Sequence, residues 1–258
     1  MSQASRILAV SVISVFLVIT SLPALAAASS VNATSQSRFH QFVCPTNSCS
    51  SNWSGYAVAG VAGSVTYVSG SWTVTAVSCP SRGTLYAAFW VGIDGYSSST
   101  VEQTGTLAEC SHGVATYSAW YEFYPSPMYT ISSVNVKPGD VITANVQYTG
   151  GSTFVATITD TTTGKSSSNS AVVTSAQRSS AEWIAEAPSS GFGVLPLANF
   201  GTVSFGPSDV ATVNGVTQAV GLFPTVWQIT MASGSTLEAE PSALAADHGS
   251  FTVAWYNT

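Results

Sequence analysis

The chain has 258 residues, of which 12 are Asp or Glu, 6 are Lys or Arg and 3 are His, so its formal net charge is −6. Basic patches are absent, which speaks against nucleic acid or an anionic membrane surface as a partner. Aromatic residues make up 11% of the chain and β-branched residues are abundant, so an intrinsically disordered protein is excluded as well.

The first 28 residues have the pattern of a secretory signal peptide. Arg6 supplies a short positive start, residues 7–18 are apolar, and small residues in Ala-x-Ala order lead to Ala28. A retained membrane anchor is the alternative, because residues 7–28 are just long enough to span a bilayer. We expect removal of the signal and export to the extracellular medium, with no membrane contact afterwards. The remaining charge is then 5 − 12 = −7.

Residues 29–50 are polar and irregular, and we interpret them as a leader or a short pro-segment. No linker divides residues 51–258, and nothing in them repeats at a fixed period, so we predict one domain there and expect a monomer.

The cysteines are the next organising feature of the chain. They are Cys44, Cys49, Cys79 and Cys110. An even number of cysteines in an exported chain favours disulfides, and three pairings are possible. The spacings fit no familiar zinc pattern, and we expect neither a metal nor a cofactor. We favour Cys44–Cys49 together with Cys79–Cys110.

Short strands separated by turns dominate the rest of the chain. Strand-like alternation with Val, Ile, Thr and aromatic residues occurs at 55–61, 64–76, 86–93, 115–124, 141–148, 154–160, 170–174, 181–187, 202–205, 226–231 and 251–256. No long segment has helical periodicity, and only residues 239–247 could form one short helical turn. Strands at hairpin spacing predict an all-β fold, an antiparallel sandwich or a barrel.

The segment 179–188 carries two of the few charges in the chain. Its alternation places Glu182, Ile184 and Glu186 on one face of a strand, and the small and aromatic residues between them on the other. An antiparallel strand can turn one face to water, so a solvated outer face is one interpretation. The other is that Glu182 lines a cleft and transfers protons.

Several hydrolase signatures are missing. The sequence has no Gly-x-Ser-x-Gly and no His-Glu-x-x-His, and no Asp-Thr/Ser-Gly of the aspartic proteases. A Ser-His-Asp triad has no fixed spacing and stays open, although His112 and His248 both fall in predicted loops.

Residues 86–124 hold a dense run of motifs. In order, the chain reads Trp-Val-Gly-Ile-Asp-Gly from Trp90, Gln-Thr-Gly from Gln103, Trp-Tyr-Glu-Phe-Tyr-Pro from Trp120, and later Ala-Glu-Trp-Ile from Ala181. With Asn-Trp-Ser-Gly from Asn52, these motifs resemble, in order and spacing, those of the glutamic peptidases (eqolisins). The resemblance covers about 51–258.

The resemblance implies an acid-active endopeptidase on a two-sheet, lectin-like antiparallel β-sandwich, with protein or peptide substrates. It also implies a Gln–Glu catalytic dyad, which by motif is Gln103 and Glu182. Trp90, Asp94 and Glu122 match residues that surround the dyad. Glu186 matches no catalytic position in this assignment, and we expect it to be supporting or solvent-facing.

The chemistry of such a dyad follows from its functional groups. A carboxylate such as Glu182 can take a proton from water and return it to the leaving amine. The amide of Gln103 supplies N–H donors for the oxyanion that do not titrate, and a carbonyl that can hold the water. Asp94 and Glu122 could tune the pKa of Glu182, and Trp90 could form a pocket wall.

The low charge has a further implication. Few ion pairs can be lost on acidification, so we hypothesise a protein built for an acidic medium. The alternative is that the low charge only reflects a Ser/Thr-rich secreted β-protein.

Two alternative functions stay open. One is a carbohydrate-binding or glycoside-hydrolysing sandwich, in which aromatic residues such as Trp72 or Trp227 stack sugars. The other is a non-catalytic adhesion domain.

Overall fold

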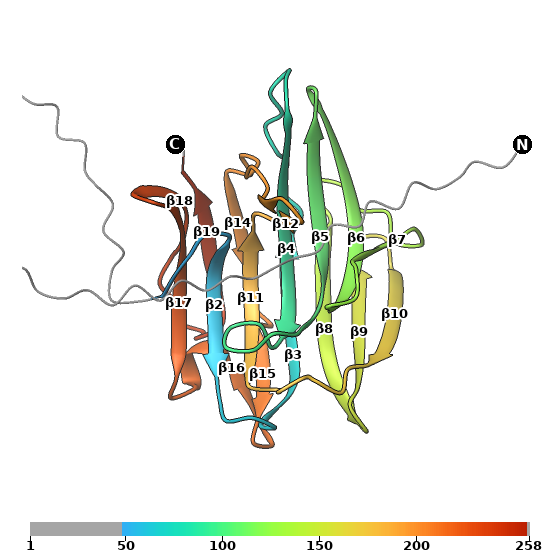
Figure 1. Ribbon diagram of the computed structural model, residues 1–258, viewed down its shortest axis with the longest axis vertical. Coiled ribbons are helices and arrows are strands. Elements are labelled where there is room, and N and C mark those ends of the chain that lie inside the picture. The colour runs from blue at the N-terminus through green and yellow to red at the C-terminus, as the bar shows by residue number, and fades with distance from the viewer. Residues whose placement is uncertain (1–47, 257–258) are drawn as a thin grey trace, which may run out of the picture.

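The computed structural model describes residues 48–256, which form strands almost throughout (Figure 1). In chain order the elements are β1 (Ser48–Ser50), β2 (Trp53–Ala59), β3 (Val65–Thr73), β4 (Thr84–Ile93), β5 (Val101–Ser111), β6 (Val114–Tyr124), β7 (Tyr129–Ile131), β8 (Val141–Gly150), β9 (Thr153–Asp160), β10 (Lys165–Val172), β11 (Ser180–Glu186), β12 (Ser189–Ser190), β13 (Gly193–Val194), β14 (Thr202–Phe205), β15 (Val210–Val213), β16 (Val216–Ala219), the 3₁₀ turn η1 (Val220–Leu222), β17 (Val226–Ser233), β18 (Thr236–Pro241) and β19 (Phe251–Trp255).

One layer of the fold is a sheet whose strand order is β1-β17-β2-β11-β4-β5-β6-β7. All neighbours in it are antiparallel except β1 and β17. Figure 1 shows this layer in front, from β17 at the left to β6 at the right. We call it the front sheet. β11 lies in its middle, hydrogen-bonded on both edges.

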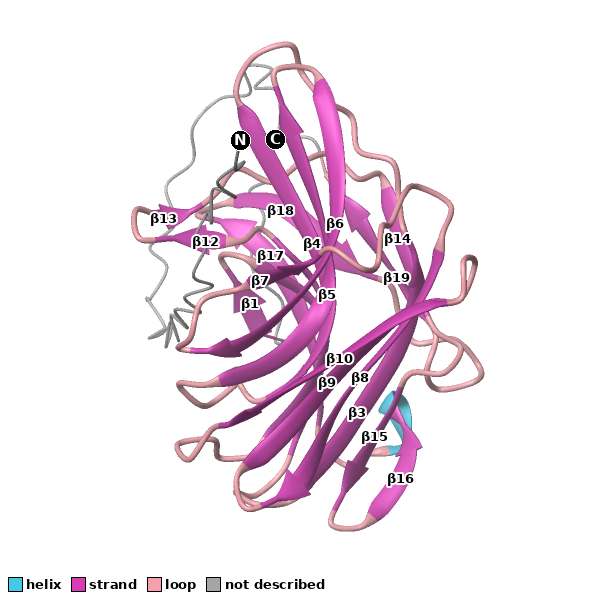
Figure 2. Ribbon diagram, turned by 90° about the vertical axis from the view of Figure 1, so that its right-hand side faces the viewer, coloured by secondary structure: helices cyan, strands magenta, loops and turns pink. Residues whose placement is uncertain are grey.

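The second layer, the back sheet, runs β10-β9-β8-β3, and β3 then pairs with both β15 and β14. The back sheet continues from β14 through β19 and β18 to β17, so the two layers are joined along that side. Figure 2 shows the layers from the side and leaves the small hairpin β12–β13 projecting from the front. The predicted β-sandwich is therefore confirmed.

Two hydrophobic clusters lie on the two faces of the front sheet. The inner core fills the space between the sheets and includes Ala181, Trp183 and Ala185 of β11. The outer cluster lies on the opposite face and consists of Trp53, Ala57, Ala88, Trp90, Val101, Leu107, Trp120, Met128, Ile184 and Ile229. The alternation predicted for 181–186 is confirmed, and Glu182 and Glu186 share the outer face with Ile184.

Each predicted strand overlaps an observed one, but the structure also differs from the prediction. β5 was not predicted, because Glu102, Gln103, Gly105 and Glu109 give it a low strand propensity. The strands β1, β7, β12, β13, β15, β16 and β18 were missed too, and the predicted strand 170–174 overlaps only the end of β10. The helical turn expected within 239–247 is absent, since residues 239–241 end β18 and the rest form a loop.

The predicted bridge between Cys79 and Cys110 is present and ties the segment before β4 to the far end of β5. Cys49 is also disulfide-bonded, and Cys44, its predicted partner, lies outside the described residues. From Ser48 to Tyr256 no helix has the length and apolar character needed to cross a membrane.

Candidate active site

Two glutamates of β11 point to the outer face of the front sheet at different positions along the strand. Glu182 pairs with Ala57 of β2 and Gly92 of β4, whereas Glu186 pairs with Trp53 and Ala88 of the same strands. Both carboxyl groups are fully buried. The interpretation of this face as a solvated surface is therefore wrong, and of the two roles expected for Glu186, supporting or solvent-facing, the solvent-facing one is wrong.

Gln103 lies in the same row of the sheet as Glu182. Gln103 of β5 is paired with Gly92 of β4, and Gly92 is paired on its other side with Glu182. Two strand spacings separate the backbones of Gln103 and Glu182 by about 10 Å. Because side chains of paired residues point to one face, the two polar groups flank the glycine.

The space above Gly92 is occupied by the indole of Trp90. A Cβ atom at position 92 would lie 2.9 Å from Trp90 Cζ3 and 3.2 Å from Gln103 Cβ, so only glycine fits there without a shift. One end of the Trp90 ring therefore reaches the row of Gln103 and Glu182. Its other end, Nε1, hydrogen-bonds to Glu186 Oε2 at 2.7 Å.

Neutral donors hold Glu186. Besides Trp90, Asn52 Nδ2 donates a hydrogen bond of 3.0 Å to Glu186 Oε1. The Trp53 indole meets that of Trp90 edge-on at 4.9 Å between ring centroids. Burial raises the pKa of Glu186 to about 8, although the N–H groups of Trp90, Trp53 and Asn52 act in the opposite direction. These donors fix the orientation of the carboxyl group.

Glu182 has fewer donors and more acidic neighbours. Neither of its carboxyl oxygens accepts a hydrogen bond of good geometry from residues 48–256. Burial raises its pKa well above the usual value. The Ser180 hydroxyl and the Tyr96 backbone act in the opposite direction, and the neighbouring carboxyl groups of Asp94 and Glu102 add to the increase. The pKa of Glu182 is thus shifted in the same direction as that of Glu186, with fewer hydrogen-bond donors acting against the shift.

Asp94 holds the backbone that leads into β11. It has a φ of +69° at the end of β4. Its carboxylate accepts backbone hydrogen bonds from Gln177 at 2.7 Å, Arg178 at 2.6 Å and Ser179 at 2.9 Å. Asp94 thereby fixes the start of the strand that carries Glu182, and its charge raises the pKa of that carboxyl.

Glu122 lies beside Gln103 and holds its amide group. It lies opposite Gln103 on β6 and is fully buried. Gln103 Nε2 donates a hydrogen bond of 2.7 Å to Glu122 Oε2. Gln103 Oε1 accepts no hydrogen bond from the described part of the chain. One N–H and the carbonyl oxygen of the amide are left for another molecule.

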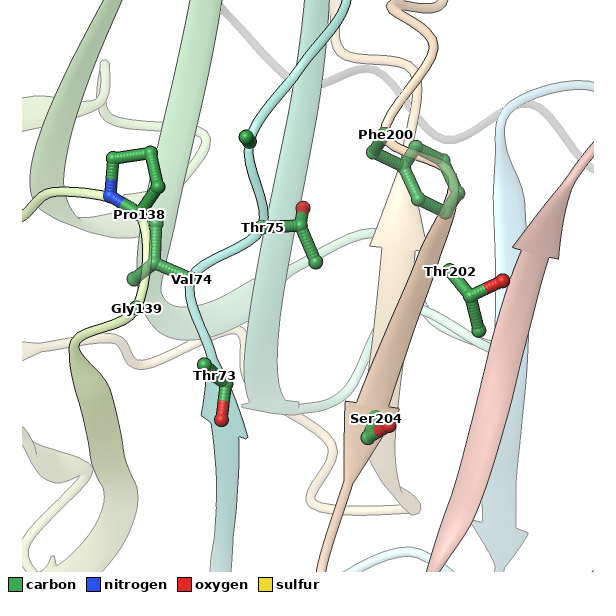
Figure 3. Close-up of a pocket in the computed structure, with 9 residues that line it drawn as sticks. Thr73, Val74, Thr75, Pro138, Gly139, Phe200, Thr202 and Ser204 are labelled. Carbon is green, nitrogen blue, oxygen red and sulfur yellow. The ribbon is translucent and has the colours of Figure 1, made fainter.

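The remaining candidates lie elsewhere. His112 and His248 are exposed in turns with positive φ, as their loop positions predicted. No group of three or more His, Cys, Asp or Glu side chains between Ser48 and Tyr256 is arranged to hold a metal ion. Trp72, among the aromatic residues considered for sugar stacking, is buried. An open pocket between the end of β3 and β14 contains none of the candidate residues (Figure 3).

Comparison with known proteins connects this geometry to a family. Residues 51–253 match the model of the Peptidase A4 family. Aspergillopepsin-2 from Aspergillus niger is 34% identical over 203 residues, covering 66% of this chain and 71% of that protein. Scytalidopepsin B from Scytalidium lignicola is 32% identical over 135 residues, covering 52% of this chain and 49% of that protein.

Solved structures agree with the sequence comparison. A crystal structure of scytalido-glutamic peptidase with a transition state analog inhibitor superposes with a TM-score of 0.68 at 26% identity, covering 80% of this chain and 98% of that one. Aspergilloglutamic peptidase from Aspergillus niger gives a TM-score of 0.60 at 31% identity, covering 67% and 99%. The chain therefore belongs to the Peptidase A4 (eqolisin) family of peptide hydrolases.

Proposed function

We propose that this chain is a secreted endopeptidase that cleaves proteins in acidic surroundings through Gln103 and a glutamate of β11. The observation that carries the proposal is the common face of the front sheet. A non-titrating amide, two buried carboxyl groups and the indole that reaches both rows all lie on it. Family membership supports peptide bonds as the substrate, which displaces the glycan-directed and adhesion alternatives.

The chemistry follows from the free groups of the site. The carboxyl group of β11 exchanges a proton with the attacking water and then with the leaving amine. Gln103 uses one N–H for Glu122 and has a second N–H for the developing oxyanion, while its Oε1 can hold the water. Because an amide does not titrate, this donor is equally available at every acidic pH.

Two glutamates can fill the role of the carboxyl group, and different observations support them. Glu182, the residue predicted from the sequence, shares a row with Gln103 across Gly92. Glu186 has hydrogen bonds from Trp90 and Asn52 that stabilise its anion. Burial raises the pKa of both groups, so their pKa shifts do not decide between them. The row shared with Gln103 favours Glu182, and Glu186 is the alternative.

The test is cleavage of an acid-denatured protein between about pH 2 and 5 by wild type, Gln103→Ala, Glu182→Gln and Glu186→Gln. Glu240→Gln on β18 serves as the matched control, and circular dichroism checks the fold of each variant. We expect Gln103→Ala and the variant of the reacting glutamate to lose activity at least a hundredfold, corresponding to about 2.7 kcal/mol. Full activity in folded Gln103→Ala contradicts the dyad.

Acidic conditions and export are supported by charge and by the N-terminal sequence. Burial raises the pKa of several carboxyl groups, so low pH keeps them neutral without cost. Residues 1–28 have the signal-peptide pattern, and 29–50 precede the domain at 51–258. Ser48–Ser50 nevertheless pair with β17, and the Ser48 and Tyr96 hydroxyls hydrogen-bond at 2.6 Å. N-terminal sequencing of the protein from culture medium locates the cut, and gel filtration tests the expected monomer.

A further inference from the structure

Phe192 is the most exposed large apolar residue in the described structure, with a relative accessibility of 105%. It lies at the tip of the hairpin formed by β12 and β13, between Gly191 and Gly193. Most exposed apolar residues lose part of their surface to neighbours, and an isolated one needs no explanation. A fully exposed phenyl ring at the tip of an ordered hairpin beside a candidate binding site does need an explanation, because aromatic rings are common anchors in molecular recognition.

The base of this hairpin is fixed next to the candidate active site. Pro188 follows Glu186 by two residues, and its carbonyl accepts a hydrogen bond of 2.8 Å from the Leu195 N–H. Leu195 packs against the outer cluster that contains Trp90. The Tyr86 N–H donates to the Pro196 carbonyl at 2.9 Å, which ties the hairpin to β4.

The tip projects from the face that carries the site. Figure 2 shows β12 and β13 on the same side of the molecule as β1, β7 and β17, opposite the back-sheet strands β3, β14 and β15. A substrate chain bound along the outer face of the front sheet therefore passes beside the hairpin. Ser190 Oγ accepts a hydrogen bond from the Phe192 N–H at 3.2 Å, so the tip has a defined backbone.

The chemistry of the hairpin points to an uncharged partner. Residues 187–208 contain no Asp, Glu, Lys, Arg or His. Val194, beside the tip, is also exposed, at 44%. Apolar surface of this kind gains from contact with another apolar side chain, because both leave water. A charged side chain gains nothing there and loses hydration.

We propose that Phe192 is a specificity-determining residue that contacts an apolar side chain of the bound peptide, on one side of the cleaved bond. The proposal rests on peptide hydrolysis at the β11 site and adds the substrate class. Phe192 takes no part in proton transfer. Its contact is made alike with the bound substrate and with the transition state, so its loss weakens binding.

The experiment uses a series of peptides with one cleavable bond, in which a Leu or a Ser is placed in turn at each position around that bond. We compare wild type, Phe192→Ser and Phe192→Leu. Val216→Ala is the matched control, because Val216 is exposed at 54% on the hairpin β15–β16, far from the site (Figure 2). For wild type we expect a preference for Leu over Ser at one position.

In Phe192→Ser that preference disappears through a rise in KM of roughly tenfold for the Leu peptide, with kcat unchanged. Phe192→Leu keeps most of the preference, and Val216→Ala behaves as wild type. An unchanged profile in Phe192→Ser, or an equal loss for all peptides, overturns the proposal. Activity that survives in Gln103→Ala contradicts the proposed dyad but leaves the role of Phe192 in substrate preference untouched. Calorimetric binding of the same peptides extends the comparison to variants that do not cleave.

Discussion

Trp90 Nε1 donates a hydrogen bond of 2.7 Å to Glu186 Oε2, which links β4 to β11 on the outer face of the front sheet. The same indole covers Gly92, the residue between Gln103 and Glu182. The Trp90 side chain thus reaches the row of Gln103 and Glu182 at one end and the carboxyl group of Glu186 at the other. A substitution of Trp90 can therefore show which of the two glutamates is the reacting one.

Trp90→Phe keeps an aromatic ring in the outer cluster and removes the donor. The anion of Glu186 loses a hydrogen bond worth about 1.5–3 kcal/mol, so the pKa of Glu186 rises further. If Glu186 is the base, kcat/KM falls about 10- to 100-fold and the acidic limb of its pH profile moves to higher pH. Trp120→Phe, in the same cluster, is the control. A pH profile identical to wild type excludes Glu186 and leaves Glu182.

Glu122→Gln tests the orientation of Gln103. The variant keeps the shape of the side chain but replaces the carboxyl group that accepts the 2.7 Å hydrogen bond by an amide. We expect kcat to fall about tenfold with KM nearly unchanged, because the contact positions a group that acts in the transition state. In the Gln103→Ala background the second substitution should have no further effect. Independent, additive losses in this double-mutant cycle argue against the positioning role.

The position of these residues could be predicted only in part. β11 and β4 were predictable because their alternation is regular and rich in Val, Ile, Trp and Phe. β5 was not, since the strand state of Gln103 and Gly105 depends on pairing with β4 and β6. Propensity describes single segments, whereas this pairing is a long-range property.

The hydrogen-bond partners of Glu186 could not be predicted for a similar reason. Its donor Asn52 lies 134 residues away in sequence and reaches it because β2 pairs with β11. A signal was nonetheless present, since Glu182 and Glu186 share one face of a strand that begins with small residues. The Asn-Trp motif at 52–53 was recognised without its partner, and that partner is Glu186.

Stability should fall as the pH rises, and Glu102 should be one cause. Burial, with the charge of Asp94, raises the pKa of Glu102 from 4.5 to about 9. Between these two values the unfolded chain releases a proton that the folded chain retains. Each such group therefore lowers the free energy of unfolding by about 1.4 kcal/mol per pH unit across that window. Below pH 4.5 the contribution is fully present, and above 9 no more is lost.

Glu102→Gln removes the titrating carboxyl group, so the stability of the variant should depend less on pH. We expect urea unfolding of the variant to show a smaller loss of stability between pH 4.5 and pH 7 than wild type, by up to about 3 kcal/mol. Glu240→Gln on β18 should follow wild type. Parallel stability curves for wild type and Glu102→Gln contradict a neutral, buried Glu102.

The bridge between Cys79 and Cys110 should affect stability without affecting catalysis. It closes a loop with a sequence separation of 31 residues, for which chain entropy gives about 3–4 kcal/mol. Cys79→Ser/Cys110→Ser should lose about that much in urea unfolding. Cys110 pairs with Leu85, at the end of the β4–β5 ladder remote from Gln103, so kcat/KM at 25 °C should stay within about twofold. A large loss of kcat/KM in the folded double variant would show that the disulfide affects catalysis as well as stability, contrary to this prediction.

The central place of β11 has a consequence for the motions of the site. Every residue from Ser180 to Glu186 is buried, and the strand is paired on both edges. Its amide protons should therefore exchange with solvent only when the whole domain unfolds, among the slowest in the protein. The backbone that carries Glu182 and Glu186 should therefore stay closed in the native state. Any movement that admits a substrate then has to occur in the surrounding segments, such as the β12–β13 hairpin.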